Sequence, residues 1–355
     1  MPDPYTWNEP DATLDDPHWI LSYARFAPSS HNSQPWLVEL VDEDHLDVYV
    51  DQTRLLNEVD PNARQAHVSL GCFLENLIVA ARHRGRAPTT TYFPEGEYGR
   101  ETVEDRPVAR IHLTDEEADD QELFEPIAER RTNKRIFEQG RAIPSVELAK
   151  LHNSNVEENV RIELFEEAET REELTELCRR AMEVEVSSRE RNRELARWFR
   201  LSDEELLDRC DGFSIAHSGS SGIAKWFTET FILNRERIEN PNGMFARQAI
   251  SMAEKQAGSA SAFALVATNG NTRLDQLLAG RSYQVLQLKA TRLGIATHPL
   301  SQPIEEYTDM GQVRSDFHEA TGLSEGETAQ MFLRLGYAES VPHTPRRPVD
   351  AIIRP

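Results

Sequence analysis

The sequence predicts an α+β fold, an α/β sandwich made of two related halves. Short apolar or alternating runs with the period of strands are interspersed with longer segments that have the period of helices. Residues 69–85 align with residues 278–294 at a constant offset of 209. In both copies the segment precedes an extended stretch and then a strand, which indicates an internal duplication. The identical pairs are Gly71 and Gly280, Leu77 and Leu286, Ala81 and Ala290, and Gly85 and Gly294.

The elements of the first half follow from turn formers and apolar runs. The segment 27–36 is dense in Pro, Ser and Asn, so it separates a short helix from a pair of strands. Gly85 is expected to end the next helix, because glycine readily adopts the left-handed conformation of a helix C-cap. The expected elements are a helix at 18–26, strands at 37–41 and 46–50, a helix at 69–84 and a strand at 108–113.

The second half begins after an acidic connector at 114–122 with a basic segment at 124–137. A long, highly charged helix is expected at 170–200, because its apolar residues recur at the helical period, and a flexible loop is expected at 211–222. The apolar stripe consists of Leu174, Leu177, Cys178, Ala181 and Met182. The other expected elements are a helix from Ser145, strands at 160–165, 261–268 and 331–337, and a helix at 274–292.

The charge of the chain excludes nucleic acid as a partner. The formal net charge is -22 over 355 residues, so phosphates would be repelled. Only five of the 39 basic residues are lysines. An ordinary acidic cytosolic protein and a halophilic one adapted to high salt both fit this composition. Thermal melts at rising salt separate the two hypotheses, because only the second expects stabilisation by salt.

Cysteine spacing and hydropathy indicate a cytoplasmic protein. Cys72, Cys178 and Cys210 are odd in number and show no CxxC spacing, which is typical of a reducing compartment and excludes a zinc ribbon. The histidines have no HExxH or paired spacing, so no metal site is expected. No apolar run approaches the roughly 18 residues of a membrane span. Residues 1–16 form an acidic, proline-rich tail unlike a signal peptide.

Two segments have the composition of a binding site. The loop Ala27-Pro28-Ser29-Ser30-His31-Asn32-Ser33-Gln34-Pro35-Trp36 offers hydroxyls, two carboxamides and an indole within ten positions. Such a set suits the edge of a planar heterocycle such as a flavin, although a simple Asx or Ser/Thr turn before a strand has the same composition.

The second segment is basic. Arg130-Arg131-Thr132-Asn133-Lys134-Arg135 lies near an expected helix start and can be interpreted as a phosphate clamp aided by backbone N–H groups, or as a solvated basic face. The shortage of lysine elsewhere favours the clamp. A second basic pair, Arg346-Arg347, lies between Pro345 and Pro348 near the C-terminus.

At these places the sequence resembles the nitroreductase family. Arg130-Arg131-Thr132-Asn133-Lys134 is similar to the motif by which members hold the FMN phosphate and the ribityl-pyrimidine end, and the segment 27–36 is similar to the loop that packs on the isoalloxazine. Arg346 or Arg347 is similar to the family's C-terminal phosphate-binding arginine. The segment Ala296-Thr297-His298-Pro299-Leu300-Ser301 is similar to the one whose backbone approaches flavin N5.

The order of these motifs implies a fused pseudo-dimer. In ordinary members the arginine motif precedes the Pro-Ser-Ser loop in a shorter chain, and two subunits share two sites. Here the order is reversed, which resembles the Acg-like branch and implies a nitroreductase-like fold with central mixed antiparallel sheets and one intact FMN site. The implied division is a tail at 1–16, one half at 17–122 and another at 123–355. A lid insertion is implied at about 170–242, with Trp198, Arg200 and Gly212 as lid residues.

The resemblance implies a function and a set of site residues. The implied activity is NAD(P)H-dependent two-electron reduction of a nitroaromatic or quinone-like small molecule on FMN, without a protein catalytic residue. Lys134 is then expected to stabilise the anionic reduced flavin near N1/O2. The alternative is a flavin-sequestering protein with an occluded pocket. A monomer or weak homodimer is expected. The implied cofactor-binding residues are Pro28, Ser29, Ser30, Asn32, Gln34, Arg130, Arg131, Thr132, Lys134, Pro299, Leu300, Ser301, Arg346 and Arg347.

Overall fold

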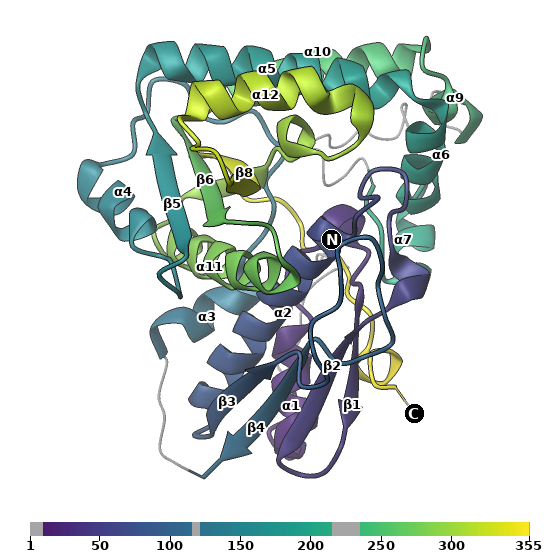
Figure 1. Cartoon of the computed structure of the whole chain (residues 1–355), viewed down its shortest axis with the longest axis vertical. Helices are drawn as coiled ribbons and strands as arrows, with labels where there is room; N and C mark the ends of the chain where they lie inside the picture. The colour runs from purple at the N-terminus through teal and green to yellow at the C-terminus, as the bar shows by residue number, and fades with distance from the viewer. Residues whose placement is uncertain (1–9, 116–120, 215–234, 355) are drawn as a thin grey trace.

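The computed structural model describes residues 10–115, 121–214 and 235–354. Two four-stranded antiparallel sheets lie on either side of a central pair of helices, α2 (Arg64–His83) and α11 (Arg273–Arg292), as Figure 1 shows. One hydrophobic core contains residues from both sheets and from both central helices. The α+β class predicted from the sequence is therefore confirmed.

The first sheet is formed by the first third of the chain. Its strand order is β1-β2-β4-β3, and α2 connects the second strand in sequence to the third. Its edge is extended by the far end of the chain, because Val38 N donates to Ile352 O and Arg354 N donates to Val38 O. The elements are α1 (Asp16–Ala24), β1 (Trp36–Leu40), β2 (His45–Val50), β3 (Ala87–Tyr92) and β4 (Ala109–Thr114).

The second sheet repeats the topology of the first. Its strand order is β5-β6-β8-β7, and α11 again connects the second strand to the third. The same four-strand, one-helix unit therefore occurs twice, which confirms the duplication predicted from the offset of 209. Gly85 and Gly294 both have positive φ just after their helices, at 83° and 68°. The strands are β5 (Val160–Phe165), β6 (Ala262–Asn269), β7 (Ala296–Pro299) and β8 (Glu327–Gly336).

The two repeats meet at a close crossing of α2 and α11. A Cβ built on Gly71 would lie 2.1 Å from Leu277 O, and one built on Gly280 would lie 2.1 Å from Val68 O. Since Val68 and Leu277 are themselves related by the offset of 209, the two clashes are equivalent, as a local two-fold axis between the helices requires. Only glycine fits at either position.

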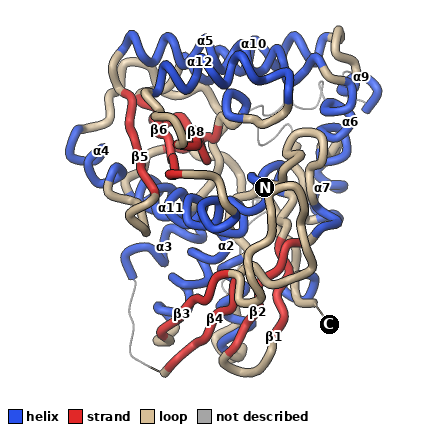
Figure 2. Tube along the Cα trace, viewed as in Figure 1, coloured by secondary structure: helices blue, strands red, loops and turns tan. Residues whose placement is uncertain are grey.

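Helices of the second half cover the outer face of the second sheet. In Figure 2, α5, α10 and α12 lie together at the end of the molecule opposite β1 to β4. Buried residues of α5 and α12 form a second core with β6 and β8. The further helices are α3 (Gln121–Glu129), α4 (Ser145–His152), α5 (Ala168–Ser187), α6 (Arg189–Trp198), α7 (Asp203–Arg209), α9 (Arg235–Glu239), α10 (Met244–Gly258) and α12 (Gly311–Thr321).

The prediction of a single long helix at 170–200 is wrong, because α5 ends before Ser188 and α6 begins after it. This residue has extended backbone angles, and its side chain caps α6 by accepting from Arg191 N. The apolar stripe was interpreted correctly: Leu174, Leu177, Cys178 and Ala181 are buried in the second core. The loop expected at 211–222 lies outside the described residues from position 215 onward.

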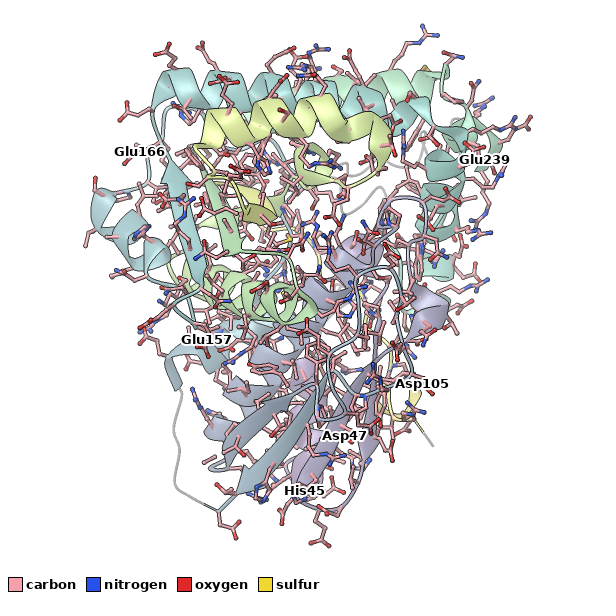
Figure 3. The ribbon with its side chains drawn as sticks, viewed as in Figure 1. His45, Asp47, Asp105, Glu157, Glu166 and Glu239 are labelled. Atoms are coloured by element: carbon pink, nitrogen blue, oxygen red, sulfur yellow. The ribbon has the colours of Figure 1, made fainter. Side chains whose placement is uncertain are left out.

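The surface carries many acidic side chains, of which Glu157 and Glu166 are exposed and labelled in Figure 3. Part of this charge is neutralised locally: Asp105, also labelled, lies 3.0 Å from a terminal nitrogen of Arg354 and thereby holds the C-terminal segment. No helix among the described residues has the length and apolar composition of a membrane span.

Candidate functional site

A cavity of about 710 Å³ lies between the central helix pair and the helices of the second half. Its walls come from the loop after α1, from α2 and α11, from the segment after α3, from α5, α6 and α10, from the segment after β7 and from the C-terminal segment. Both halves and both ends of the described chain therefore contribute to one site. The volume lies within the range of small-molecule and cofactor sites.

Most of the residues predicted from the sequence line this cavity. They come from four segments that lie far apart in the chain, and the fold brings these segments together. The lining residues among those predicted are Pro28, Ser29, Ser30, Asn32, Arg130, Arg131, Thr132, Lys134, Pro299, Leu300, Ser301 and Arg346.

Gln34 and Arg347 do not line the cavity but hold its walls together. Gln34 Nε2 donates to Cys210 O at 2.8 Å, and Gln34 Oε1 accepts from Arg347 N at 2.8 Å. The guanidinium of Arg347 lies 3.3 Å from the Asp51 carboxylate. Both residues therefore position the loop after α1, the segment after α7 and the C-terminal segment relative to one another.

The expected helix start at the basic cluster is wrong. Helix α3 ends at Glu129, so Arg130 to Arg135 follow a helix C-terminus, where the backbone presents carbonyls rather than N–H groups. The segment is extended, and Thr132 forms a parallel bridge with Thr297 beside β7. Side chains rather than a helix dipole therefore supply the positive charge of this part of the site.

The cavity has a cationic end at which arginines face each other without acidic partners. Burial and the neighbouring charges of Arg130 and Arg25 lower the pKa of Arg346 to about 9. Burial also lowers the pKa of Arg130, which is 5% exposed. No carboxylate is among the groups that shift either pKa, and the Nε atoms of both residues lack a partner. Clustered, desolvated cations with unused donors form an anion-binding site, and the planar guanidinium suits phosphate.

The loop after α1 has an unusual backbone that directs its polar side chains. His31, Asn32 and Gln34 have positive φ values of 55°, 52° and 53°, and Ser29 Oγ accepts from Gln34 N. Asn32 Nδ2 donates to Gly212 O at 3.0 Å and to Pro345 O at 3.1 Å, whereas its Oδ1 is buried without a partner. Three left-handed residues in four positions store strain that the surrounding contacts must offset.

The segment that joins α6 to residue 214 packs directly against this loop, since Asn32 Nδ2 donates to Gly212 O and the rings of His31 and Phe213 lie 5.4 Å apart. Phe199 and Phe213 line the cavity and form a parallel bridge, whereas the predicted lid residues Trp198, Arg200 and Gly212 lie behind them. Arg200 pairs with Asp211, which also lies 2.6 Å from the guanidinium of Arg54. These ion pairs join Arg200, Asp211 and Arg54.

The middle of the cavity contains a lysine and two neutral histidines. Lys134 Nζ lies 4.7 Å from the centre of the Phe213 ring, and burial lowers its pKa, an effect that Glu185 opposes. Burial and Lys134 lower the pKa of His31 to about 3. His298 Nδ1 accepts from Arg334 Nε at 3.0 Å, so this buried ring is neutral with its proton on Nε2.

The wall also contains polar groups that were not predicted from the sequence, among them a phenol, a carboxamide and two carboxyls. Tyr283 on α11, Gln65 on α2, and the carboxyls of Glu185 and Glu305 all line the cavity. A signal existed for Glu185, because it follows Met182 by three residues and therefore lies on the same face of α5. The other three have no local pattern that distinguishes them from packing or surface residues.

The residues related to this site by the duplication differ in character from those that line it. Cys72 of α2 lines the cavity, and the residue related to it by the offset of 209 is Arg281 of α11. Arg281 Nε lies 2.8 Å from Glu75 Oε2, and the same guanidinium donates to Tyr92 OH. Leu274, Leu277 and Leu278 take the places of Gln65, Val68 and Ser69. The polar residues with which α2 lines the cavity are therefore replaced on α11 by leucines and by a paired arginine. This difference explains how two related halves yield one site.

Fold and site together define a class of protein: a duplicated α+β chain with a cofactor-sized cavity that is cationic at one end. No family model matches the chain. The chain is similar to a Mycobacterium tuberculosis protein named provisionally as an NAD(P)H nitroreductase. The two are 24% identical over 348 residues, which cover 94% of this chain and 90% of the relative. Acg of the same organism, named in the same way, is 24% identical over 339 residues, covering 92% of this chain and 91% of Acg.

Solved structures of lower similarity bear related names. The FMN-dependent nitroreductase NfnB from Mycobacterium smegmatis, in complex with NADPH, is 16% identical, with a TM-score of 0.41, and 66% of this chain and 97% of NfnB are covered. A nitroreductase with bound FMN from Bacteroides fragilis is 16% identical, with a TM-score of 0.36. The match covers 62% of this chain and 90% of the Bacteroides chain. The nearly full-length relatives confirm the predicted resemblance to the nitroreductase family and to its Acg-like branch.

Proposed function

We propose that the cavity binds one FMN. The observation that carries this proposal is the pair Arg130 and Arg346, two buried or half-buried guanidiniums without carboxylate partners and with unused Nε donors. A phosphate monoester would satisfy both. The unpaired Asn32 Oδ1 would accept from the edge of the isoalloxazine, and Pro299 to Ser301 also line the cavity. The names of the nitroreductase relatives support the same cofactor.

The function that this site supports is NAD(P)H-dependent two-electron reduction of a quinone-like or nitroaromatic acceptor. FMN, when bound, supplies the hydride chemistry, and the protein provides position, charge and exclusion of water. Arg130 and Arg346 would anchor the phosphate. Lys134 would place a positive charge where reduction adds negative charge, and Phe199 and Phe213 would exclude water from the same region.

Rapid mixing of the flavin-loaded chain with NADPH or NADH tests the activity. Fast bleaching of the long-wavelength flavin absorbance is the expected result. A flavin that binds but stays oxidised would contradict reductase activity and would favour sequestration, for which the fixed contacts of Asn32 and Gln34 to the segment after α7 provide a structural basis.

Lys134→Met is expected to lower the two-electron reduction potential of the bound flavin by about 30 mV or more. This shift corresponds to a loss of about 1.4 kcal/mol of charge stabilisation in the reduced state. Spectroelectrochemical titration measures it. Lys255→Met is the matched control, since Lys255 also lines the cavity but is exposed, and its potential is expected to equal that of the wild type. Equal shifts in both variants would contradict the role of Lys134.

We further propose that the chain divides at about residue 122 into halves at 17–122 and 123–355, with an insertion at about 170–242. The tail at 1–16 and the insertion lie partly outside the described residues. Because α2 and α11 pair within one chain, the subunit contact of a symmetric dimer is already satisfied, and a cytoplasmic monomer is expected. Sedimentation as a dimer at micromolar concentration would contradict the monomer.

A further inference from the structure

Two acidic side chains lie on the cavity wall at a distance from its arginine end. Glu305 follows the short helix Gln302–Ile304 and is 4% exposed, and Glu185 lies on α5. Both line the cavity, and the positive charges that act on them are those of Arg191 and Lys134 for Glu185 and of Arg64 for Glu305. The carboxyl of Glu305 accepts a hydrogen bond from Gln65 Nε2, a neutral donor. Removal of a carboxyl from water is costly for the carboxylate and favours the neutral acid.

The surroundings of Glu185 favour its protonated form near neutral pH. Burial raises the pKa of Glu185 to about 7, although the side chain of Gln302 and the charges of Arg191 and Lys134 oppose the shift. The positive charge of Arg191 is largely engaged, since it forms two hydrogen bonds with Asp309, at 3.0 and 2.6 Å. The titratable or charged groups that face Glu185 are Lys134, Arg191, Glu305 and Tyr307.

We propose that Glu185 is the proton donor to the electron acceptor, and that the acceptor is a quinone-type molecule with a carbonyl oxygen directed at this carboxyl. This inference rests on the proposed function, which supplies the hydride. Apolar and aromatic residues line the same cavity and provide a surface for a flat ring. Those residues are Met182, Val186, Leu195, Phe199, Phe245 and Met252.

The proposed step balances in electrons and protons. A quinone takes up two electrons and one proton as a hydride, which leaves a hydroquinone monoanion. The O–H bond of the Glu185 carboxyl then breaks as the second phenolic O–H bond forms, and the product is the neutral hydroquinone. The Glu185 carboxylate regains its proton from water. Burial raises the pKa of the neighbouring Glu305 well above its ordinary value, and Gln65 Nε2 donates to its carboxyl.

Glu185→Gln tests the step, because the carboxamide has the same shape but cannot release a proton. Glu173→Gln, exposed on the same helix, is the control. With the flavin-loaded chain reduced by NAD(P)H, we expect the variant to reduce benzoquinone roughly 100-fold more slowly at pH 6, the lower end of general-acid effects. Ferricyanide takes up electrons without protons, so its reduction is expected to be unchanged. The wild-type benzoquinone rate should fall as pH rises through about 7, and the variant should lack this inflection.

A second measurement does not depend on turnover. A carboxyl whose pKa is raised from 4.5 to about 7 loses stabilisation of the folded state as pH rises between these values. The Tm of the wild-type chain should therefore fall relative to that of Glu185→Gln from pH 5 to pH 8. A constant Tm difference, or equal benzoquinone rates with intact ferricyanide reduction, would overturn this inference alone. Failure of the chain to bind flavin would overturn the proposed function as well.

Discussion

Arg130→Met and Arg346→Met are each expected to weaken FMN binding by roughly 10- to 100-fold. A hydrogen bond to a charged group contributes about 1.5–3 kcal/mol, and each substitution removes at least one such bond to the phosphate. Riboflavin lacks the phosphate, so its affinity should change little in either variant. Fluorescence titration of the flavin-free chain with both ligands measures the difference directly.

Arg135→Met is the matched control for this experiment. Arg135 belongs to the same basic cluster, but it does not line the cavity, and its guanidinium lies 3.2 Å from Glu339 on the surface. Its substitution is expected to leave both affinities unchanged. Equal losses of FMN and riboflavin affinity in the Arg130 and Arg346 variants would contradict a phosphate site and would indicate general damage to the cavity.

Gly71→Ala and Gly280→Ala are expected to destabilise the fold by about 3 kcal/mol each. The added methyl group would lie 2.1 Å from a backbone carbonyl oxygen, so no side-chain rotation can relieve the overlap. Overpacking of this kind outweighs the roughly 0.5–1 kcal/mol that alanine gains over glycine within a helix. Denaturant unfolding of the flavin-free chain gives the free energy of unfolding.

Gly99→Ala serves as the control, since a Cβ at this position meets nothing within 4 Å. Its free energy of unfolding should match that of the wild type. Because the two helices are equivalent, the Gly71 and Gly280 variants should lose similar amounts. Unchanged stability in either variant would show that the helices can separate at the crossing without cost.

The sequence was sufficient to predict the duplication because the crossing itself demands glycine. Gly71 and Gly280 are close to a local axis where no side chain fits, and Gly85 and Gly294 end their helices at positive φ. Such requirements are local and leave a pattern in the residues. Most site residues were also predictable, since polar loop residues and clustered arginines stand out in a chain poor in lysine.

Other features depend on tertiary contacts that no local pattern records. The break at Ser188 follows from a capping serine within a charged stretch that otherwise has continuous helical propensity. Gln34 and Arg347 resemble ligand-binding residues in sequence, yet they bond to each other and to the segment after α7. Glu305 is noticeable only once the fold buries it beside Gln65.

The residues related to the site by the duplication account for the expected number of flavins per chain. Arg281, Glu75 and Tyr92 form a polar cluster where the second repeat would place a cavity wall. The basic cluster and the loop after α1 each occur once, and they converge on the same cavity. One flavin per chain, where a symmetric pair of such halves would hold two, is therefore the expected stoichiometry.

The absorption spectrum of the purified full chain, with flavin counted per polypeptide after release, tests the central claim most directly. The account predicts a yellow protein that holds one FMN per chain, or a colourless one that takes up one equivalent when FMN is added. A chain that stays colourless with excess FMN, or that binds two equivalents, would contradict it.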